Sequence, residues 1–520
     1  MSTLQEERYR ASSKDNGLVA RHGVRSRGHV VAALWPYLLI IVVAAVLAYS
    51  NVSNAPAFQN DEGVYTYQAR AIWGGSLAPY SYWYDHPPFG WMQLAAFGWI
   101  PALLGLGDSA VGSMRYVVAS YLVLNSVLIY ALARRLGLRQ VFALVGAALF
   151  VLSPLSLELG RQVLLDNLAT PWILGAFLLV LSPSRNLAAH IGAGACFAIG
   201  VLSKETMAIY GPVLLYLLWR NSHPQTRSFS LLGFLTVGGL LLSAYPLMAL
   251  LKGELFPRQG RNTLWDALMF QFVERRGSGY LWQPGSVRSE LIGGWLFFDS
   301  YLLFGGVAAA LLLVLVSRTR WITFAVAMFL LPLIASQGYL PAMYVVAGLP
   351  FLALAVGAAA DQMWTLGTAR SGRFWRPVKL VTAVILVTAL YSVTMPSWKL
   401  HNTATLTQLK NNDWVQTVAW MKSNLARDSV IVVPPSMWQD LRDAGWPSQW
   451  SVIATEKVDL DPVEFARRHP RGWRELNYVV VNPQVQADIG YLGLSQLNQA
   501  VQAGTTVATF GETRILRIAP

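Results

Sequence analysis

The chain has 520 residues, of which 54% are hydrophobic and 13% charged, with a mean hydropathy of +0.41. Soluble globular proteins carry about 25% charged residues, so this composition excludes a soluble fold and indicates a polytopic membrane protein. The net charge of +13 and the pI near 9.8 could suggest nucleic-acid binding, but in a membrane protein basic residues first report sidedness. The single cysteine, Cys196, excludes a disulfide framework and any multi-cysteine metal site, and we interpret it as a packing residue.

The amino-terminal segment 1–29 has six Lys or Arg residues and precedes the uncharged run 30–50. That run is too long for the core of a cleaved signal peptide, so we interpret it as a retained first span that follows a cytoplasmic basic segment. An odd number of spans places the carboxyl-terminal region on the opposite side. Length and hydropathy predict about eleven spans, at 30–50, 114–133, 141–157, 167–182, 188–203, 206–219, 229–251, 295–317, 321–336, 340–360 and 380–395.

We therefore expect a cytoplasmic amino terminus (1–29), an α-helical transmembrane domain (30–395) and a small extracytoplasmic α/β domain (396–520). The outward loop 51–113 contains apolar stretches with Trp and Tyr residues, which predict helices at the membrane interface. The outward loop 252–294 combines arginines with aromatic residues, a mixture that a lipid-headgroup site at the membrane surface requires.

The carboxyl-terminal region shows the patterns of a small α/β domain. No glycine-rich dinucleotide fingerprint and no paired Cys/His spacing accompany its strands. The domain could bind an acceptor or merely cap the outer face. The predicted elements are a helix at 414–425, strands at 429–433 and 478–481, a helix at 494–503 and a strand pair around Gly511.

The first outward loop carries two pairs of candidate site residues. Asp61 and Glu62 follow shortly after the first span, where a carboxylate could serve catalysis or simply cap the next helix. Asp85 and His86 precede two prolines, and the alternative interpretation is a turn into the following helix.

Four further ionisable residues lie near the outer ends of later spans. Arg161 and Asp166 flank the start of the fourth span, and Lys204 and Glu205 lie in the turn after the fifth. Ionisable groups at membrane depth are costly, so their recurrence predicts one shared outer cavity. An ion pair between Arg161 and Asp166, or snorkelling of Lys204 to the surface, is the alternative.

Together these residues resemble the GT-C superfamily of membrane glycosyltransferases, in the branch that contains protein O-mannosyltransferases and the lipid A aminoarabinose transferases. The resemblance covers roughly the first 220 residues, and beyond them it is architectural. No segment similar to the MIR insertion of eukaryotic protein mannosyltransferases is evident. The matching motifs are DE at Asp61-Glu62, HPP at His86-Pro87-Pro88, R-x-x-x-x-D from Arg161 to Asp166 and, more loosely, SKE at Ser203-Lys204-Glu205.

The resemblance implies inverting transfer of a sugar from a polyprenyl-phosphate donor to an acceptor on the outer face of the membrane. Asp61 is then the expected general base, and Glu62 would orient the acceptor or hold a partner of Asp61. Arg161, Asp166 and Glu205 would support the site together with Asp85 and His86. The expected ligands of the donor phosphate are Lys204, Arg258, Arg261, Arg275 and Arg276.

No cofactor is required by these patterns, but a divalent metal ion near the phosphate is possible, with Asp61, Asp85, His86 and Asp166 as candidate ligands. The expected partners are the lipid-linked donor, a glycan, lipid or protein acceptor and membrane lipids, without nucleic acid. The expected location is the plasma membrane, in envelope glycan or glycolipid assembly. The alternatives are a transporter or flippase of lipid-linked sugars and a non-catalytic envelope assembly protein.

Overall fold

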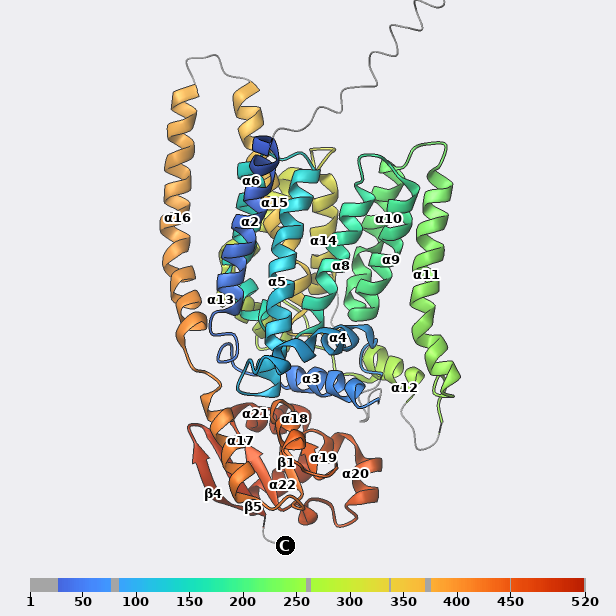
Figure 1. The fold of residues 1–520 in the computed structure, drawn as a ribbon, viewed down its shortest axis with the longest axis vertical. Coiled ribbons are helices and arrows are strands. Elements are labelled where there is room, and N and C mark those ends of the chain that lie inside the picture. Colours follow the sequence, from blue (N-terminus) through green and yellow to red (C-terminus); the bar gives the residue numbers. More distant parts are fainter. Residues whose placement is uncertain are drawn as a thin grey trace, which may run out of the picture.

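The computed structural model describes residues 27–75, 84–258, 263–335, 338–369, 376–448 and 450–518. Within these ranges the chain forms a helical bundle and an α/β unit at one end of it, with short helices between the two (Figure 1). We call the end of the bundle nearest the α/β unit its domain-side end. Most of the basic amino-terminal segment, residues 1–26, lies outside the described residues.

The bundle helices follow the predicted apolar runs, which confirms an α-helical membrane protein. Four helical stretches are long and apolar enough to cross a membrane among the described residues: α5, α11, α13 and 344–366. The bent pair of α6 and α7 (Pro154–Gly160) is a fifth candidate, and the count of eleven spans stays a prediction. The bundle helices are α2 (Arg27–Tyr49), α5 (Ala110–Arg135), α6 (Gln140–Leu152), α8 (Leu165–Val180), α9 (Leu187–Ser203), α10 (Gly211–Asn221), α11 (Arg227–Leu251), α13 (Val287–Leu313), α14 (Arg320–Ala335), α15 (Leu349–Ala369) and α16 (Arg376–Thr407).

Two of the predicted runs differ from the observed helices in an informative way. The run at 206–219 is divided into a 3-10 turn, η1 (Glu205–Tyr210), and α10. The helix predicted to end at 395 instead continues through Pro396 to Thr407. Both differences arise because hydropathy reports apolar surface and not where backbone geometry starts or stops.

Close helix packing explains several glycines of the bundle. A Cβ atom on Gly194 of α9 would lie 2.4 Å from the backbone oxygen of Phe234 on α11. A Cβ atom on Gly357 of α15 would lie 2.7 Å from the backbone oxygen of Phe142 on α6. Small residues at helix contacts let backbones approach closely, which is the usual way helices associate where water supplies no driving force.

Three shorter helices lie between the bundle and the α/β unit (Figure 1). Two of them, α3 (Asn60–Trp73) and α4 (Phe89–Leu103), lie within the segment 51–113, where interfacial helices were predicted. The third, α12 (Leu264–Met269), continues into the π-turn η2 (Phe270–Glu274).

The α/β unit contains a five-stranded mixed sheet in the order β2-β1-β3-β5-β4. The central strand β1 pairs in parallel with β2 and β3, and β5 pairs antiparallel with β3 and β4. The predicted helices and strands are present, but β2 and the helices α18 to α21 were not predicted. The bounds are α17 (Asn412–Asn424), β1 (Ile431–Val433), α18 (Pro435–Asp443), β2 (Val452–Ala454), α19 (Lys457–Leu460), α20 (Pro462–Arg468), η5 (Gly472–Glu475), β3 (Tyr478–Val481), α21 (Pro483–Leu492), α22 (Ser495–Ala503), β4 (Gly504–Phe510) and β5 (Thr513–Ile518).

Helix α18 holds the α/β unit against α3. The rings of Tyr67 and Trp438 stack in parallel with their centroids 4.0 Å apart. Gly63 faces the backbone of Pro435 so closely that a Cβ atom there would lie 2.1 Å from its carbonyl carbon. The contact places the α/β unit over α3, the helix that carries Asp61 and Glu62. Both the unit and α3 therefore border the candidate site.

Candidate active site

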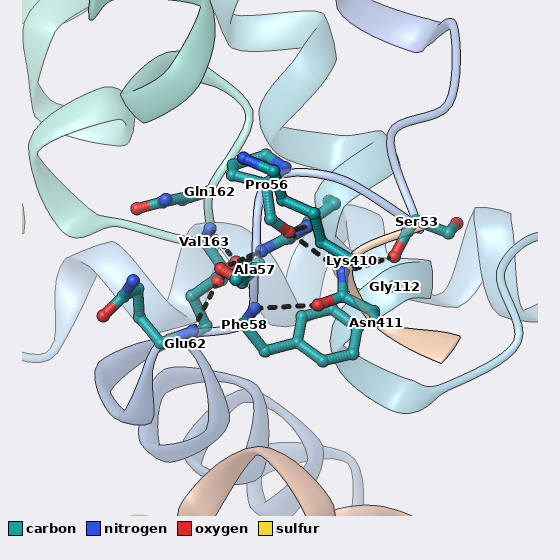
Figure 2. A network of polar contacts seen from close by, with 12 residues as sticks. Ser53, Pro56, Ala57, Phe58, Glu62, Gly112, Gln162, Val163, Lys410 and Asn411 are labelled. Atoms are coloured by element: carbon teal, nitrogen blue, oxygen red, sulfur yellow. Dashed lines mark hydrogen bonds and ion pairs between the residues drawn. The ribbon is translucent and has the colours of Figure 1, made fainter. Parts of the chain in front are cut away.

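The carboxylate of Glu62 is fully buried and bound on all sides. Its two oxygens accept hydrogen bonds from Arg115, Oε1 from Nη2 at 2.6 Å and Oε2 from Nε at 2.8 Å. The backbone N–H of Val163 donates to the same carboxylate at 2.8 Å (Figure 2). The backbone N–H of Gln59 donates to it at 3.0 Å. Glu62 therefore caps the start of α3 and ties it to α5 and the α7–α8 turn.

The loop before α3 is fixed by Asn411, in the segment that joins α16 to the α/β unit. Its side-chain amide donates to the backbone oxygens of Ser53 and Pro56 at 2.9 Å each and accepts from the Phe58 N–H at 2.9 Å (Figure 2). The entry into α3 is thus held from both ends of the chain, which makes the position of the acidic pair rigid.

Asp61 has the opposite surroundings to those of Glu62. It is half-buried in the first turn of α3, and no hydrogen bond to its carboxylate is found among the described residues. It does not cap the helix, because Glu62 fills that role. Its charge raises the pKa values of Tyr65, Tyr339 and Asp488, so Asp61 lies near residues of α3, of the segment before α15 and of α21.

His86, Lys204 and Glu205 form one charged cluster at the domain-side end. Both carboxylate oxygens of Glu205 lie 3.1 Å from Nδ1 of His86, and the Lys204 ammonium lies 3.1 Å from Nε2 of the same ring. Burial raises the pKa of Glu205, but the positive charges of His86 and Lys204 outweigh it and hold that pKa below its ordinary value. Lys204 is only 1% exposed, so it does not snorkel to the surface.

Asp166 completes this cluster from the first turn of α8. It is 1% exposed, and neither carboxylate oxygen has a hydrogen-bond partner among the described residues. It interacts electrostatically with Lys204, Glu205 and His86. A buried carboxylate without a partner is costly, which is typical of a site that a ligand completes.

Arg161 has a different role from that of Asp166. Its guanidinium is buried and donates to the backbone oxygens of Ser50 and Thr405, which joins the ends of α2 and α16. The suggested ion pair between Arg161 and Asp166 is not found among the residues that the structure describes. Arg161 supports the site only by holding these helix ends together.

Tyr65 links Asp61 to the charged cluster, and sequence reasoning missed it. It lies one turn after Asp61 on α3, and its ring contacts that of His86 at a centroid distance of 5.8 Å. Burial raises the pKa of the Tyr65 phenol, and the charges of Asp61 and Asp166 raise it further. Tyr65 is therefore a neutral hydrogen-bond donor, and its i, i+4 spacing from Asp61 was the available signal.

The remaining predicted site residues are less closely grouped than those of the charged cluster. Asp85 is exposed beside the cluster, and Arg258 and Arg276 are exposed. Arg261 lies outside the described residues. The guanidinium of Arg275 stacks 3.3 Å from the ring centroid of Tyr339, whose pKa also responds to Asp61.

The metal hypothesis gains no ligand set from this geometry. In the described part of the chain, no group of three or more His, Cys, Asp or Glu residues could hold a metal ion. The lysine ammonium beside His86 also disfavours a cation at that ring.

Comparisons with known proteins agree with this fold. Residues 85–247 match a family model described as dolichyl-phosphate-mannose-protein mannosyltransferase, a stretch that includes His86, Asp166 and Lys204. None of the curated protein sequences compared with the chain matches it.

Solved membrane glycosyltransferases share the fold over nearly the whole chain. ArnT from Cupriavidus metallidurans in the apo state gives a TM-score of 0.56 at 16% identity, covering 94% of this chain and 100% of that chain. The same protein bound to undecaprenyl phosphate gives 0.54 at 15% identity, with 95% and 100% covered. The archaeal oligosaccharyltransferase AglB from Archaeoglobus fulgidus, in complex with an inhibitory peptide and a dolichol-phosphate, gives 0.52 at 14% identity, with 89% and 71% covered.

The fold and family-model matches define a class. The chain has the fold of the GT-C membrane glycosyltransferases, and within them it resembles the O-mannosyltransferase and ArnT branch, which confirms the resemblance carried by the motifs. The fold match extends past residue 252, where sequence motifs were lacking.

Proposed function

We propose that this protein is an inverting glycosyltransferase that moves a sugar from a polyprenyl-phosphate donor to a hydroxyl acceptor on the outer face of the plasma membrane. The single observation that carries the proposal is the cluster of Lys204, His86 and Asp166, with Tyr65 between His86 and Asp61; within the described ranges neither the Asp166 nor the Asp61 carboxylate has a hydrogen-bond partner. The similar fold of an enzyme solved with undecaprenyl phosphate supports a lipid-phosphate donor.

The donor phosphate is assigned to Lys204 and His86. Both lie at the ends of apolar helices, where a lipid phosphate sits at the membrane surface. Glu205 binds both groups, and the phosphodiester anion of an incoming donor would replace it as their partner. Arg275, held flat against Tyr339, is a second cation from the loop 252–294 that could approach the same donor.

Activation of the acceptor hydroxyl is assigned to Asp61. The acceptor oxygen attacks the anomeric carbon, the bond from that carbon to the phosphate oxygen breaks, and polyprenyl phosphate leaves with the electron pair. Asp61 takes the proton of the acceptor hydroxyl, and the cations neutralise the leaving phosphate. A direct displacement of this kind inverts the anomeric configuration.

The outer face follows from chemistry and predicted topology. Nucleotide sugars are cytosolic, whereas the predicted sidedness puts this site on the other side of the membrane, so a lipid carrier must deliver the sugar. The amino-terminal basic segment and the odd number of predicted spans support that sidedness. The α/β unit, packed on α3 beside Asp61, then lies outside and borders the acceptor's path.

The test uses the full-length protein in detergent with a panel of polyprenyl-phosphate sugars. Asp61→Asn should lower transfer by a factor of about 10² to 10⁴, the usual contribution of a general base, and leave donor binding unchanged. Asp108→Asn, at an exposed aspartate before α5, is the matched control and should retain activity. Saturable donor binding without transfer by any variant would favour the transporter, and full transfer by Asp61→Asn would remove the proposed base.

A further inference from the structure

Arginine side chains converge on one short turn, residues 314–319, which joins α13 to α14. The turn lies at the end of the bundle opposite the α/β unit, where α10 ends and α14 begins (Figure 1). Nε of Arg320 donates to the backbone oxygen of Val314 at 2.8 Å, and Nη1 of Arg220 donates to that of Ser317 at 3.0 Å. Two guanidinium groups are thus held at the carboxyl end of α13, where exposed carbonyls attract cations.

A third guanidinium belongs to the turn itself. Arg318 is exposed, and its side chain forms no hydrogen bond or ion pair within the described ranges. It lies beside the turn between α5 and α6, where Gly137 has a φ of 73° and a Cβ atom would meet the guanidinium of Arg318. The missing side chain at Gly137 therefore leaves room for this arginine. We call Arg220, Arg318 and Arg320 the arginine cluster.

The positive charge of the arginine cluster is not balanced by nearby acids. Toward this end of the bundle, Asp361 on α15 is the one acidic residue in the described part of the chain, and its ion-pair partner is Arg139 at 3.7 Å. A guanidinium carries five N–H donors, whereas Arg220 and Arg320 each use a single nitrogen in their contacts with the described residues. The remaining donors and three positive charges suit an anion with several oxygens, such as a phosphate group.

Apolar side chains beside the cluster favour a lipid over a free anion. Leu311 and Leu312, at the end of α13, are exposed, and Leu315 in the turn is 84% exposed. Trp219, at the end of α10, is also exposed. In a membrane-spanning bundle such leucines contact hydrocarbon, and a tryptophan at a helix end is typical of the membrane interface. A ligand that matches both the arginines and the leucines is amphipathic.

We propose that the arginine cluster binds the phosphodiester headgroup of an anionic phospholipid, whose acyl chains lie along the exposed leucines of α13. Basic groups between membrane helices recognise such headgroups, and the predicted sidedness places this end at the cytoplasmic leaflet, whose surface is negative. The site lies at the opposite end of the bundle from Asp61 and Lys204, so it does not rest on the proposed function. The competing interpretation is that these arginines serve membrane sidedness alone.

The test titrates a fluorescent diphosphatidylglycerol into the purified full-length protein in a nonionic detergent. Binding should be saturable, and unlabelled diphosphatidylglycerol should compete. Phosphatidylcholine, whose headgroup has no net charge, should compete about 100-fold more weakly, since each of three arginines near a lipid surface contributes about fivefold. Inorganic phosphate at the same concentration should not compete, because it lacks acyl chains. Absence of saturable binding, or equal competition by phosphatidylcholine or inorganic phosphate, would overturn the proposal.

Arg318→Gln separates a defined site from general attraction by charge. Because this side chain forms no hydrogen bond within the described ranges, the unfolding temperature should stay close to that of the parent protein. The dissociation constant of the labelled lipid should rise about fivefold. The matched control is Arg185→Gln, at an exposed arginine between α8 and α9 on the same end of the bundle. It removes the same charge and should change the constant less than about twofold, because salt screens a charge outside the site.

Equal weakening by the two variants would show that net charge alone attracts the lipid, and the proposed site would be wrong. A second measurement does not depend on any substitution. Diphosphatidylglycerol with a photoreactive acyl chain should label the end of α13 near Leu315. Labelling confined to other helices would exclude the proposed position of the acyl chains.

Discussion

The Lys204 ammonium lies 3.1 Å from Nε2 of His86, although the two residues are 118 positions apart in the chain. One comes from the end of α9 and the other from the turn that leads into α4, and Glu205 bridges both. Three ionisable groups are thus held together at a helix end, in an arrangement that a phosphate could enter by exchanging with one carboxylate.

Lys204→Met should weaken donor binding more than it slows transfer at saturating donor. A charge-assisted hydrogen bond contributes about 1.5 to 3 kcal/mol, so the dissociation constant for a polyprenyl-phosphate sugar should rise about 10-fold to 150-fold. Equilibrium binding of a labelled donor measures the effect. Lys204→Arg keeps the charge and should lose less, whereas unchanged binding in Lys204→Met would contradict the phosphate assignment.

Tyr65→Phe should separate the role of the hydroxyl from that of the aromatic ring. The phenylalanine ring can keep the contact with His86, so the unfolding temperature should stay close to that of the parent protein. Loss of one hydrogen-bond donor beside Asp61 should lower transfer about threefold to tenfold. Initial rates at saturating donor measure this change, and a rate equal to that of the parent protein would exclude a role for the hydroxyl.

Glu62→Gln should destabilise the protein, whereas Asp61→Asn should not. Removing one partner of a buried ion pair leaves the other charge uncompensated and costs about 3 to 5 kcal/mol. The Arg115 guanidinium would be left in that state, because it and Glu62 are both fully buried. Thermal unfolding in detergent compares the two variants, and equal unfolding temperatures would show that Glu62 does not hold α3.

Contact between the α/β unit and α5 should depend on pH. Asp440 of α18 accepts a hydrogen bond from the Ala110 N–H at 2.8 Å, and burial raises the pKa of its carboxyl to about 6. Because the folded state holds this proton more tightly than the unfolded state does, the contribution to stability is full below about pH 4 and is lost as the pH rises through 6. The difference amounts to about 3 kcal/mol for a shift of two pKa units.

Asp440→Asn should flatten this part of the pH dependence of the unfolding temperature, measured between pH 4 and 7. Burial likewise raises the pKa of Asp488 to about 6, so some slope should persist until Asp488→Asn is added. An unchanged slope in Asp440→Asn would contradict the assignment.

Gly63→Ala should loosen the α/β unit from the bundle. The added Cβ would lie 2.1 Å from the backbone of Pro435, a distance that forces α3 and α18 apart. Limited proteolysis of the segment 408–411 should therefore become faster. Gly74→Ala, at the end of the same helix, meets only one atom at 3.4 Å and serves as the control. Equal cleavage of both variants would show that this contact does not hold the unit.

The sequence was most informative about features that repeat or lie close together along the chain. Apolar runs located the bundle helices, and the motifs containing His86, Asp166 and Lys204 located residues that the structure brings into one cluster. The spacing of Tyr65 from Asp61 could also have been used, because residues four apart share a helix face.

What the sequence could not reveal are contacts between distant segments. Nothing near Glu62 indicates that Arg115, 53 residues later, takes up its charge. The strand β2 has only three residues, and its pairing with β1 depends on tertiary structure and not on a local pattern. The same holds for the stack of Tyr67 on Trp438, which decides where the α/β unit lies.

Asp61 and Glu62 at the start of α3 have different roles because consecutive residues on a helix point about 100° apart. The Glu62 side chain points inward and makes structural contacts, whereas the Asp61 side chain is only half-buried. Replacing both at once would therefore abolish activity for two unrelated reasons. Only single substitutions, each with its own folding measurement, can distinguish loss of the proposed base Asp61 from loss of the structural contacts of Glu62.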